Sequence, residues 1–449
     1  MFLREKLDVL DNWAKKEERK PLILRGARQV GKTTLIRMFA ENFEQYIELN
    51  LEKQDDRRFF EGENDIKDIV KAIFLSRDKV VNGKKTLIFI DEIQNSPYAV
   101  KMLRYFYEDY GQLFVVAAGS LLESLLKFKE SFPVGRIEYM YLYPFTFREF
   151  LSAKGKNGLI EALNEIPFAR LLHDELLKNF SEYALIGGMP EIVKSYLKFE
   201  DIVEISPIYE TLLVSYMEDV EKYAKSEKQK TVLRYVIRSS FKEAGKRIKF
   251  EGFGDSKYKY REVKDALATL EKAMLIQLLF PTVSTTPPIS EKFRKSPKIH
   301  LLDTGLVNYF AGAQREFILN RYLEDIYSGT IAEHIVGQEL FATEYSQFRK
   351  PTFWVKEKKQ SNAEVDFVYQ FMDMIIPVEV KAGKTGKLRS LMQFVDAAPH
   401  NFAVRVYSGK FSVENSKTIA GKKFKLLNLP FYLVGEINKY LERLINYSD

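Results

Sequence analysis

The chain has 449 residues and a formal net charge of +7, and 46% of its residues are hydrophobic. Two or three domains are expected, because this length is too great for one ordinary core. Cysteine is absent, which excludes disulfides, thiolate zinc sites and iron–sulfur ligation by this chain and is typical of a reducing compartment. No stretch approaches the roughly 20 apolar residues of a membrane span, so we expect a cytoplasmic protein without membrane contact.

The first predicted strand, residues 21–24, runs into the segment GARQVGKTT, and an amphipathic helical pattern follows. Two glycines in this segment permit a tight turn whose backbone N–H groups, together with a helix N-terminus, bind phosphate. The pattern predicts a P-loop that binds ATP. The expected nucleotide-binding residues are Gly26, Ala27, Arg28, Gln29, Val30, Gly31, Lys32, Thr33 and Thr34.

Two side chains of this loop are assigned chemical roles. Lys32 is expected to reach the β- and γ-phosphates as a catalytic point charge. The hydroxyl of Thr33 is expected to ligate Mg²⁺, with the hydroxyl of Thr34 as the alternative.

The other half of a nucleotide site is expected at the ends of two further buried strands. The strand at residues 86–91 ends in Asp91, which is predicted to hold Mg²⁺ through water. Glu92, the next residue, is predicted to polarise the water that attacks the γ-phosphate. The strand at residues 113–118 leads to Ser120, which is either a polar sensor of the γ-phosphate or a simple turn residue. Ligands of such sheets bind at the carboxyl ends of the strands.

Residues 1–150 alternate strands and helices, which predicts an open, mostly parallel α/β sheet. Arg136 follows the third of these strands. It is either an arginine finger, acting on its own site or on that of a neighbouring subunit, or an ordinary surface arginine. Arg148 is a second candidate.

The middle of the chain is predicted to be mostly helical. Residues 151–205 read as a lid or connector, broken by a Gly-Gly-Met-Pro turn at 187–190. Residues 206–315 read as helices followed by strand, turn and strand, which is the order of a winged helix. Basic residues interleaved with aromatic ones, at 242–264, 292–298 and 356–359, indicate either contact with DNA or solvated faces.

Residues 316–449 are predicted to contain a helix, three strands, a helix and another strand. Asp366 lies on the second of these strands, and Glu379 and Lys381 lie two apart on the third, hence on one face. Two carboxylates that bind Mg²⁺ beside a lysine that activates water are what a metal-dependent nuclease needs. Glu333, on the preceding helix, is a further candidate ligand, and Glu364 is either another ligand or a charge on an edge strand.

Together these segments resemble a known group, the AAA-type ATPases with an N-terminal P-loop domain and a C-terminal uncharacterised domain of restriction-endonuclease-like, or PD-(D/E)XK-like, fold. The resemblance is carried by GARQVGKTT, LIFIDEIQ, the AAGS turn, GRIEYMYLYPFTFREFL, ALIGGMPEIV, KIHLLDTGL, AEVDFVYQ and IIPVEVKAG. It implies ATP and Mg²⁺ binding at Lys32, Thr33 and Asp91, hydrolysis through Glu92, and a homo-oligomeric ring or dimer that completes the site. The chain departs from the usual nuclease pattern in having Val365 before Asp366.

Three functions remain open at this point. The first is an ATPase that acts on or with DNA through the winged-helix and endonuclease-like domains. The second is a regulatory ATPase switch whose endonuclease-like domain is inactive and binds protein or DNA. The third is a small-molecule kinase, which the adjacent carboxylates Asp91 and Glu92 disfavour because they suit activation of water better than binding of an acceptor.

Overall fold

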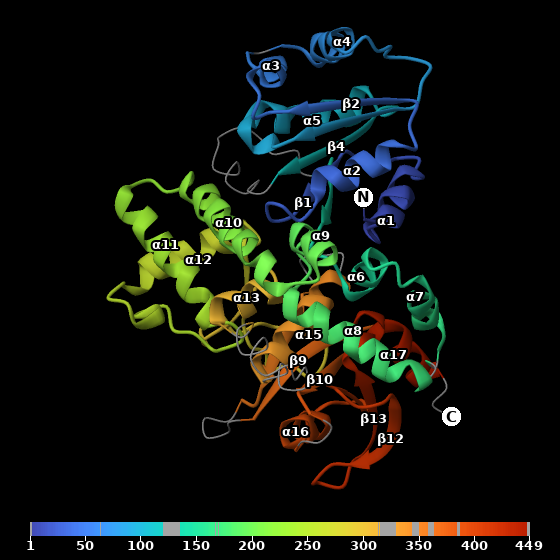
Figure 1. Ribbon diagram of the computed structural model, residues 1–449, viewed down its shortest axis with the longest axis vertical. Helices are drawn as coiled ribbons and strands as arrows, with labels where there is room; N and C mark the ends of the chain where they lie inside the picture. The colour runs from blue at the N-terminus through green and yellow to red at the C-terminus, as the bar shows by residue number, and fades with distance from the viewer. Residues whose placement is uncertain are drawn as a thin grey trace. The chain divides into compact units, whose positions relative to one another are not determined.

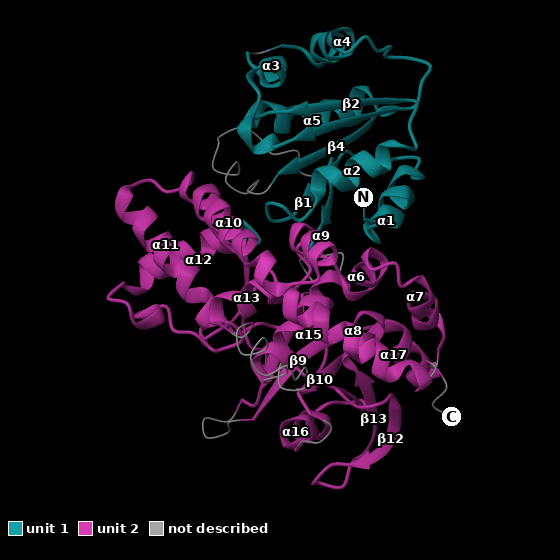
Figure 2. Ribbon diagram, viewed as in Figure 1, with its two compact units in different colours: residues 1–143, 272–274 teal, residues 144–271, 275–449 magenta. Residues whose placement is uncertain are grey.

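The computed structural model describes residues 2–62, 64–119, 135–166, 168, 170–312, 314, 329–343, 350–357, 363–383 and 387–446. The chain forms two compact units, residues 1–143 with 272–274 and residues 144–271 with 275–449 (Figure 2). The predicted boundary at residue 150 lies close to this division. The predicted boundaries at 205 and 315 lie inside the second unit.

The first unit is built on a five-stranded parallel sheet within the described residues (Figure 1). Its strands are β1 (Leu22–Arg25), β2 (Gln45–Asn50), β3 (Thr86–Asp91), β4 (Phe114–Gly119) and β5 (Glu138–Tyr141). Their order is β2-β3-β4-β1-β5. Because every pair is parallel, the ends of β1, β3 and β4 lie along one edge, as a P-loop NTPase sheet requires. The predicted parallel α/β sheet is confirmed.

Helices cover both faces of this sheet. They are α1 (Lys6–Ala14), α2 (Lys32–Ala40), α3 (Gln54–Arg57), α4 (Ile66–Ser76) and α5 (Pro97–Asp109), with the short 3-10 helices η1 (Arg58–Phe60) and η2 (Ile93–Asn95). On one face α4 and α5 pack against Ile88 and Ile90 of β3. On the other face Trp13 of α1, Phe39 of α2 and Phe114 of β4 form an aromatic cluster. Alternating apolar side chains of the strands thus fill two cores, which fixes the sheet in register.

The second unit begins with helices. These are α6 (Phe147–Ala153), α7 (Asn157–Asn164), the short 3-10 helix η4 (Arg170–Leu172), α8 (His173–Ile186), α9 (Pro190–Phe199), α10 (Ile202–Glu221), α11 (Glu227–Lys242), the short 3-10 helix η5 (Phe253–Asp255), α12 (Tyr260–Lys272), α13 (Thr304–Ala311) and α15 (Gly329–Thr343). Between α12 and α13 lie the antiparallel strands β6 (Ile276–Leu279) and β7 (Lys298–Leu301). The predicted order of helices and then two strands is therefore present. That this region is a winged helix stays a prediction.

A mixed sheet completes the second unit. Its strands are β8 (Thr352–Val355), β9 (Glu364–Phe371), β10 (Met374–Lys381), β11 (Phe402–Tyr407), β12 (Ser412–Lys417) and β13 (Lys423–Pro430), in the order β12-β13-β11-β10-β9-β8. Helix α16 (Arg389–Ala397) packs on the sheet through Leu391, Phe394 and Val395. The predicted helix, three strands, helix and strand are present, whereas β12, β13, the short 3-10 helix η8 (Phe431–Glu436) and α17 (Ile437–Asn446) were not predicted. Among the helices of the described residues, none is both long and apolar enough to span a membrane.

Candidate functional site

The turn between β1 and α2 has the backbone of a phosphate-binding loop. Gly31 caps α2 with φ 95°, a left-handed conformation that glycine adopts without strain, and Gln29 is also left-handed at φ 66°. At Gly26 a Cβ atom would lie 2.6 Å from the carbonyl oxygen of Leu142. Glycine is required at this position because any side chain would collide with the backbone.

Lys32 lies folded over this loop. Only 7% of the residue is exposed, and its Nζ donates to the carbonyl oxygens of Gly26, at 2.9 Å, and Ala27, at 2.8 Å. These contacts hold the ammonium at the mouth of the turn, where phosphate oxygens would compete with the carbonyls for it.

Thr33 and Asp91 connect the P-loop to β3. The Oγ1 of Thr33 donates to the Oδ2 of Asp91 at 2.8 Å. Burial raises the pKa of Asp91, while the Thr33 hydroxyl and the Lys32 charge oppose that rise. A hydroxyl and a carboxylate are hard oxygen donors, and Mg²⁺ at nucleotide sites takes one or two such protein ligands and completes its shell with phosphate and water. The donor set therefore fits Mg²⁺.

Glu92 is directed away from the line of β3 by its backbone. It has φ 53° and ψ 41°, an uncommon left-handed conformation for a residue other than glycine. Its carboxylate accepts a hydrogen bond from the Nε2 of Gln94. Burial raises the pKa of Glu92, and Gln94 and Lys32 oppose the rise. The geometry supplies a half-buried carboxylate one residue beyond Asp91, held by a neighbouring amide.

The remaining predicted residues of the first unit are placed differently. Arg28 is half-buried, and Thr34 is exposed on α2. Ser120 lies outside the described residues. Arg136 precedes β5, at the amino edge of the parallel sheet, and its Nε donates to Glu108 near the end of α5. Within one chain Arg136 is thus at the edge opposite the P-loop. The structure does not bring it to the phosphate site of its own chain.

Arg4 is a site residue that sequence reasoning missed. It is 6% exposed, and its guanidinium donates to the carbonyl of Val30, at 2.7 Å, and to that of Tyr143, at 2.7 Å. It therefore ties the start of the chain to the P-loop backbone. A single arginine in an unremarkable N-terminal segment carries no signal of this role.

The second unit gathers the carboxylates predicted for a nuclease. Glu333 lies on α15, Asp366 on β9 and Glu379 on β10, and the antiparallel register of β9 and β10 brings the last two side by side. Burial and then the Asp366 charge raise the pKa of Glu333 to about 7 and that of Glu379 to about 7. The Nζ of Lys381 lies 2.7 Å from the Oε1 of Glu379. The Oε2 of Glu379 is buried and accepts no hydrogen bond from any residue that the structure describes.

Basic residues from the middle region enter the same cluster. The Nζ of Lys298 lies 2.8 Å from the Oε1 of Glu364 and 3.2 Å from the Oε2 of Glu333. Arg247 also pairs with Glu364, at 2.6 Å. Two expectations are corrected here. Glu364 lies on β9, an inner strand, so it is not an edge charge, and Lys298 is buried among carboxylates, which removes it from the predicted DNA-contact surface.

Within the described part of the chain, no group of three or more acidic or histidine side chains is arranged to hold a metal ion. Glu333, Asp366 and Glu379 influence one another electrostatically without converging on one point. The partnerless Oε2 of Glu379 still fits a metal ligand, because a buried carboxylate oxygen without a donor is costly unless something binds it.

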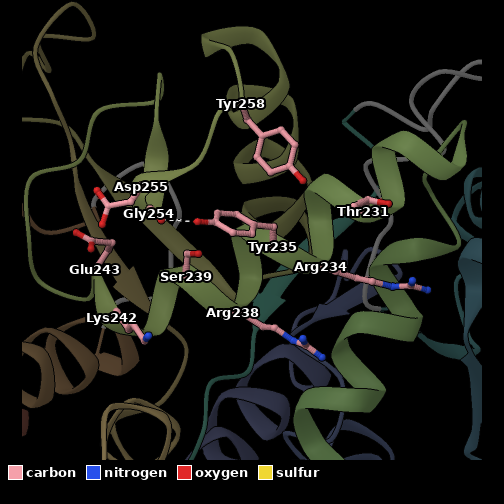
Figure 3. A pocket seen from close by; sticks show the side chains of 10 residues that line it. All are labelled: Thr231, Arg234, Tyr235, Arg238, Ser239, Lys242, Glu243, Gly254, Asp255 and Tyr258. Atoms are coloured by element: carbon pink, nitrogen blue, oxygen red, sulfur yellow. Dashed lines mark hydrogen bonds between the residues drawn. The ribbon is translucent and has the colours of Figure 1, made fainter.

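A cavity of about 560 Å³ lies beside α11. Figure 3 shows Arg234 and Arg238 extending in the same direction from α11, while Tyr235 reaches toward Gly254 and its hydroxyl donates a hydrogen bond to the Gly254 carbonyl oxygen. Arg234 is neutralised by two contacts with Glu221. Arg238 and Lys242 are exposed and have no recorded ion-pair partner among the described residues. Lys242 begins the predicted basic stretch 242–264, and Arg238 precedes it on α11. Neither cation is neutralised by a residue that the structure describes.

Three family models match successive parts of the chain. Residues 18–151 match an AAA domain, residues 177–316 a domain of unknown function, DUF8612, and residues 328–432 another, DUF4143. The first match supports an AAA-type P-loop ATPase domain in the first unit, as predicted. The predicted endonuclease-like identity is not tested by the match to DUF4143.

The chain is also similar to individual proteins. It is 26% identical over 407 residues to the uncharacterised protein MJ1637 of Methanocaldococcus jannaschii, covering 85% of this chain and 79% of that protein. Among solved structures, it resembles the Walker-type ATPase PABY2304 of Pyrococcus abyssi, with 17% identity, a TM-score of 0.44, and coverage of 69% of this chain and 96% of the other. It also resembles the RuvB Holliday junction branch migration motor of Thermotoga maritima, with 17% identity, a TM-score of 0.28, and coverage of 65% and 91%.

Proposed function

We propose that the chain is an ATPase that binds and hydrolyses ATP with Mg²⁺ in its first unit and acts on or with DNA through its second. The observation that carries the ATPase is the meeting of Lys32, Thr33, Asp91 and Glu92 where β1 and β3 end. A cation for phosphate, two hard oxygen donors and a separate carboxylate are the parts that phosphoryl transfer to water needs.

The residues divide the work in the proposed reaction. Lys32 exchanges the carbonyls of Gly26 and Ala27 for phosphate oxygens and neutralises their charge. Thr33 and Asp91 would hold Mg²⁺, which would supply positive charge to neutralise the phosphates. Glu92 accepts a proton from water and orients it for attack on the γ-phosphate. The hydrogen bond from Gln94 keeps the Glu92 carboxylate in place.

Arg136 supports a homo-oligomer within this proposal. Since it stands at the edge of the sheet opposite the P-loop, as an arginine finger it would act on the site of a neighbouring subunit. A dimer or ring of chains would supply that arrangement. Arg136→Ala should then lower turnover by about 10³-fold or more, the contribution typical of an arginine finger, and mixing with a Lys32→Ala chain should restore part of it. A loss confined to stability would instead support the surface role.

DNA contact is supported by the exposed face of α11. Arg238 and Lys242 are free to neutralise backbone phosphates, which supply most sequence-independent affinity. Arg238→Ala with Lys242→Ala should reduce the slope of log affinity against log salt by about 2, since each lost phosphate contact contributes about 0.9. Fluorescence anisotropy with a labelled duplex measures this slope. Lys410→Ala with Lys417→Ala, two exposed residues of the same unit, removes equal charge and should leave the slope unchanged.

The carboxylate cluster of the second unit is compatible with two candidate functions. Asp366, Glu379 and Lys381 have the residue types of a PD-(D/E)XK nuclease, which favours cleavage. The ammonium of Lys298 among the same carboxylates favours the alternative, a regulatory ATPase whose inactive domain binds DNA or protein. Plasmid nicking with Mg²⁺ that is lost in Glu379→Ala and Lys381→Ala would support the first candidate. ATPase activity without cleavage under any divalent metal would support the second.

The ATPase itself is tested by phosphate release from ATP, measured with and without DNA. We expect Mg²⁺-dependent turnover that changes when DNA is added. Failure of the pure protein to bind either ADP or a nonhydrolysable ATP analogue in calorimetry would overturn the proposal.

A further inference from the structure

Lys298 places a positive charge inside the carboxylate cluster of the second unit. It begins β7, and its side chain is 9% exposed. Its Nζ bridges Glu364, on β9, and Glu333, on α15, at 2.8 and 3.2 Å. A buried ammonium is stable only where opposite charges surround it. Here it neutralises residues that belong to two other elements.

The carboxylates have unmet capacity for a cation. Among the described residues, four carboxylates interact electrostatically with three cations; the carboxylates are Glu333, Glu364, Asp366 and Glu379, and the cations are Lys298, Arg247 and Lys381. Asp366 accepts a hydrogen bond from the backbone N–H of Val380 at 2.8 Å. The buried Oε2 of Glu379 accepts none from the described part of the chain. A buried carboxylate oxygen without a donor is what a divalent cation would satisfy.

The two cations that hold Glu364 come from one stretch of paired backbone. Arg247 and Lys298 are partners in a β-bridge. The N–H of Gly245 donates to the carbonyl of Ile299 at 2.8 Å, and the N–H of Ile248 donates to that of Pro297 at 2.9 Å. Residues 245–248 of this pairing follow α11, which ends at Lys242, and residues 298–299 belong to β7. A displacement of this paired stretch would withdraw both cations from Glu364 together.

We propose that Lys298 is the resident counter-cation of this cluster and competes with a divalent metal ion for it, so that metal binds when the ammonium is displaced. The inference rests on the proposed endonuclease-like site and concerns its regulation. The absence of a preformed metal-binding group among the described residues is the expected state while Lys298 remains in place.

The test measures Mn²⁺ binding by electron paramagnetic resonance, which requires no enzyme activity. All variants carry Asp91→Asn, which removes the metal carboxylate of the P-loop. Lys298→Met should bind Mn²⁺ more tightly than this parent by roughly 5- to 150-fold, the usual range of coupling between two sites. Lys298→Arg keeps the charge and should behave as the parent. Adding Glu379→Gln to Lys298→Met should abolish the gain and so locate the metal.

Lys298→Gln is the second neutral variant, since its amide can still donate to Glu333 or Glu364 and preserve the fold. Equal Mn²⁺ affinity in the parent and in the neutral variants would overturn the competition while leaving a metal site in place. No binding in any variant would overturn the inference together with the endonuclease-like site. Neither outcome would affect the proposed ATPase.

Discussion

The hydroxyl of Thr33 donates to the carboxylate of Asp91 at 2.8 Å, joining the first turn of α2 to the end of β3. These residues are 58 positions apart, and both were predicted to serve one Mg²⁺ ion. Their contact brings the two halves of the predicted nucleotide site together before any ligand arrives. A preorganised site loses less conformational freedom on binding.

Replacing Lys32 with alanine should nearly abolish nucleotide binding. The ammonium is 7% exposed, and truncating one partner of a buried charge pair costs roughly 2 to 5 kcal/mol, or about 30- to 5,000-fold in affinity. Calorimetry with a nonhydrolysable ATP analogue and Mg²⁺ measures the change. Lys71→Ala, on the exposed face of α4, is the control and should bind as the wild type does. Affinity within threefold of wild type in Lys32→Ala would contradict the assignment.

Glu92→Gln should bind ATP with unchanged affinity and turn it over slowly. The amide is similar in size to the carboxylate but cannot accept a proton, and general-base catalysis contributes roughly 10²- to 10⁴-fold to a rate. Single-turnover hydrolysis, compared with the dissociation constant of the ATP analogue, separates chemistry from binding. Turnover within a factor of three of wild type would show that another group activates the water.

The dependence of kcat on pH should report Glu92. A base must be ionised to act, and burial raises the pKa of Glu92 above its ordinary value. The rate should therefore fall as pH is lowered, and this fall should begin at a higher pH than an ordinary glutamate would give. Gln94→Ala removes a donor that lowers this pKa, so its acidic limb should move to higher pH. The limb should be missing from the residual rate of Glu92→Gln, and a limb of the same position there would assign it to another group.

Local patterns in the sequence were enough to predict the tight turn after β1 and the carboxylates at the end of β3. Each of these features is recognisable within a few residues of sequence. They are Gly26 and Gly31 with the adjacent Lys32 and Thr33, and the apolar strand followed by Asp91 and Glu92. The parallel sheet also followed from local patterns, since strands such as Thr86–Asp91 are buried throughout and helices alternate with them.

Contacts between distant segments could not be predicted in the same way. Lys298 ends a run of basic residues and was read as part of a solvated or DNA-binding face, because charge in a sequence does not reveal burial. β12 has the sequence SVENSK, which is mostly polar and lies at an edge of the sheet, so it lacks the alternation that marks a half-buried strand. Arg4 contacts backbone carbonyls, which every residue has, so the sequence does not indicate these contacts.

The turn with two glycines at 187–188 and the LLDTG segment at 301–305 are far apart in the sequence and pack closely against each other in the structure. A Cβ on Gly187 would lie 2.1 Å from the Oδ1 of Asp303, and one on Gly305 would lie 2.0 Å from the carbonyl oxygen of Ile186. The glycines are thus required by close approach, a reason that only the fold provides.

Arg4→Ala should weaken both the first unit and its P-loop. Each hydrogen bond from a charged donor contributes roughly 1.5 to 3 kcal/mol, and Arg4 makes one to Val30 and one to Tyr143. We expect a lower free energy of unfolding and weaker ATP binding. Arg4→Lys restores the charge but cannot donate in the same fork, so it should recover only part of both. Unchanged nucleotide affinity in a destabilised Arg4→Ala would limit Arg4 to a structural role.

The free energy of unfolding of the second unit should decrease as the pH is raised from 4 to 6, because of Asp303. This residue is fully buried and accepts hydrogen bonds from the N–H groups of Gly188, at 2.6 Å, and Leu306, at 3.1 Å, yet burial raises its pKa from 3.8 to about 6. Since the folded state holds this proton more tightly than the unfolded state, the free energy of unfolding should fall as pH rises through this window and level off above it. The difference between a pKa of 3.8 and one of about 6 corresponds to about 3 kcal/mol of unfolding free energy.

Trp354 allows the pH dependence of the unfolding free energy to be measured for the second unit alone. The chain has two tryptophans, and Trp13→Phe leaves Trp354, which is buried beside Phe394, as the fluorescent reporter of urea unfolding. Other groups also titrate between pH 4 and 6, so the difference between this parent and Asp303→Asn is the quantity to follow. Asparagine cannot ionise, and the slope assigned to Asp303 should disappear from that variant. Parallel curves for the two proteins would mean that Asp303 does not change its protonation on unfolding in this range.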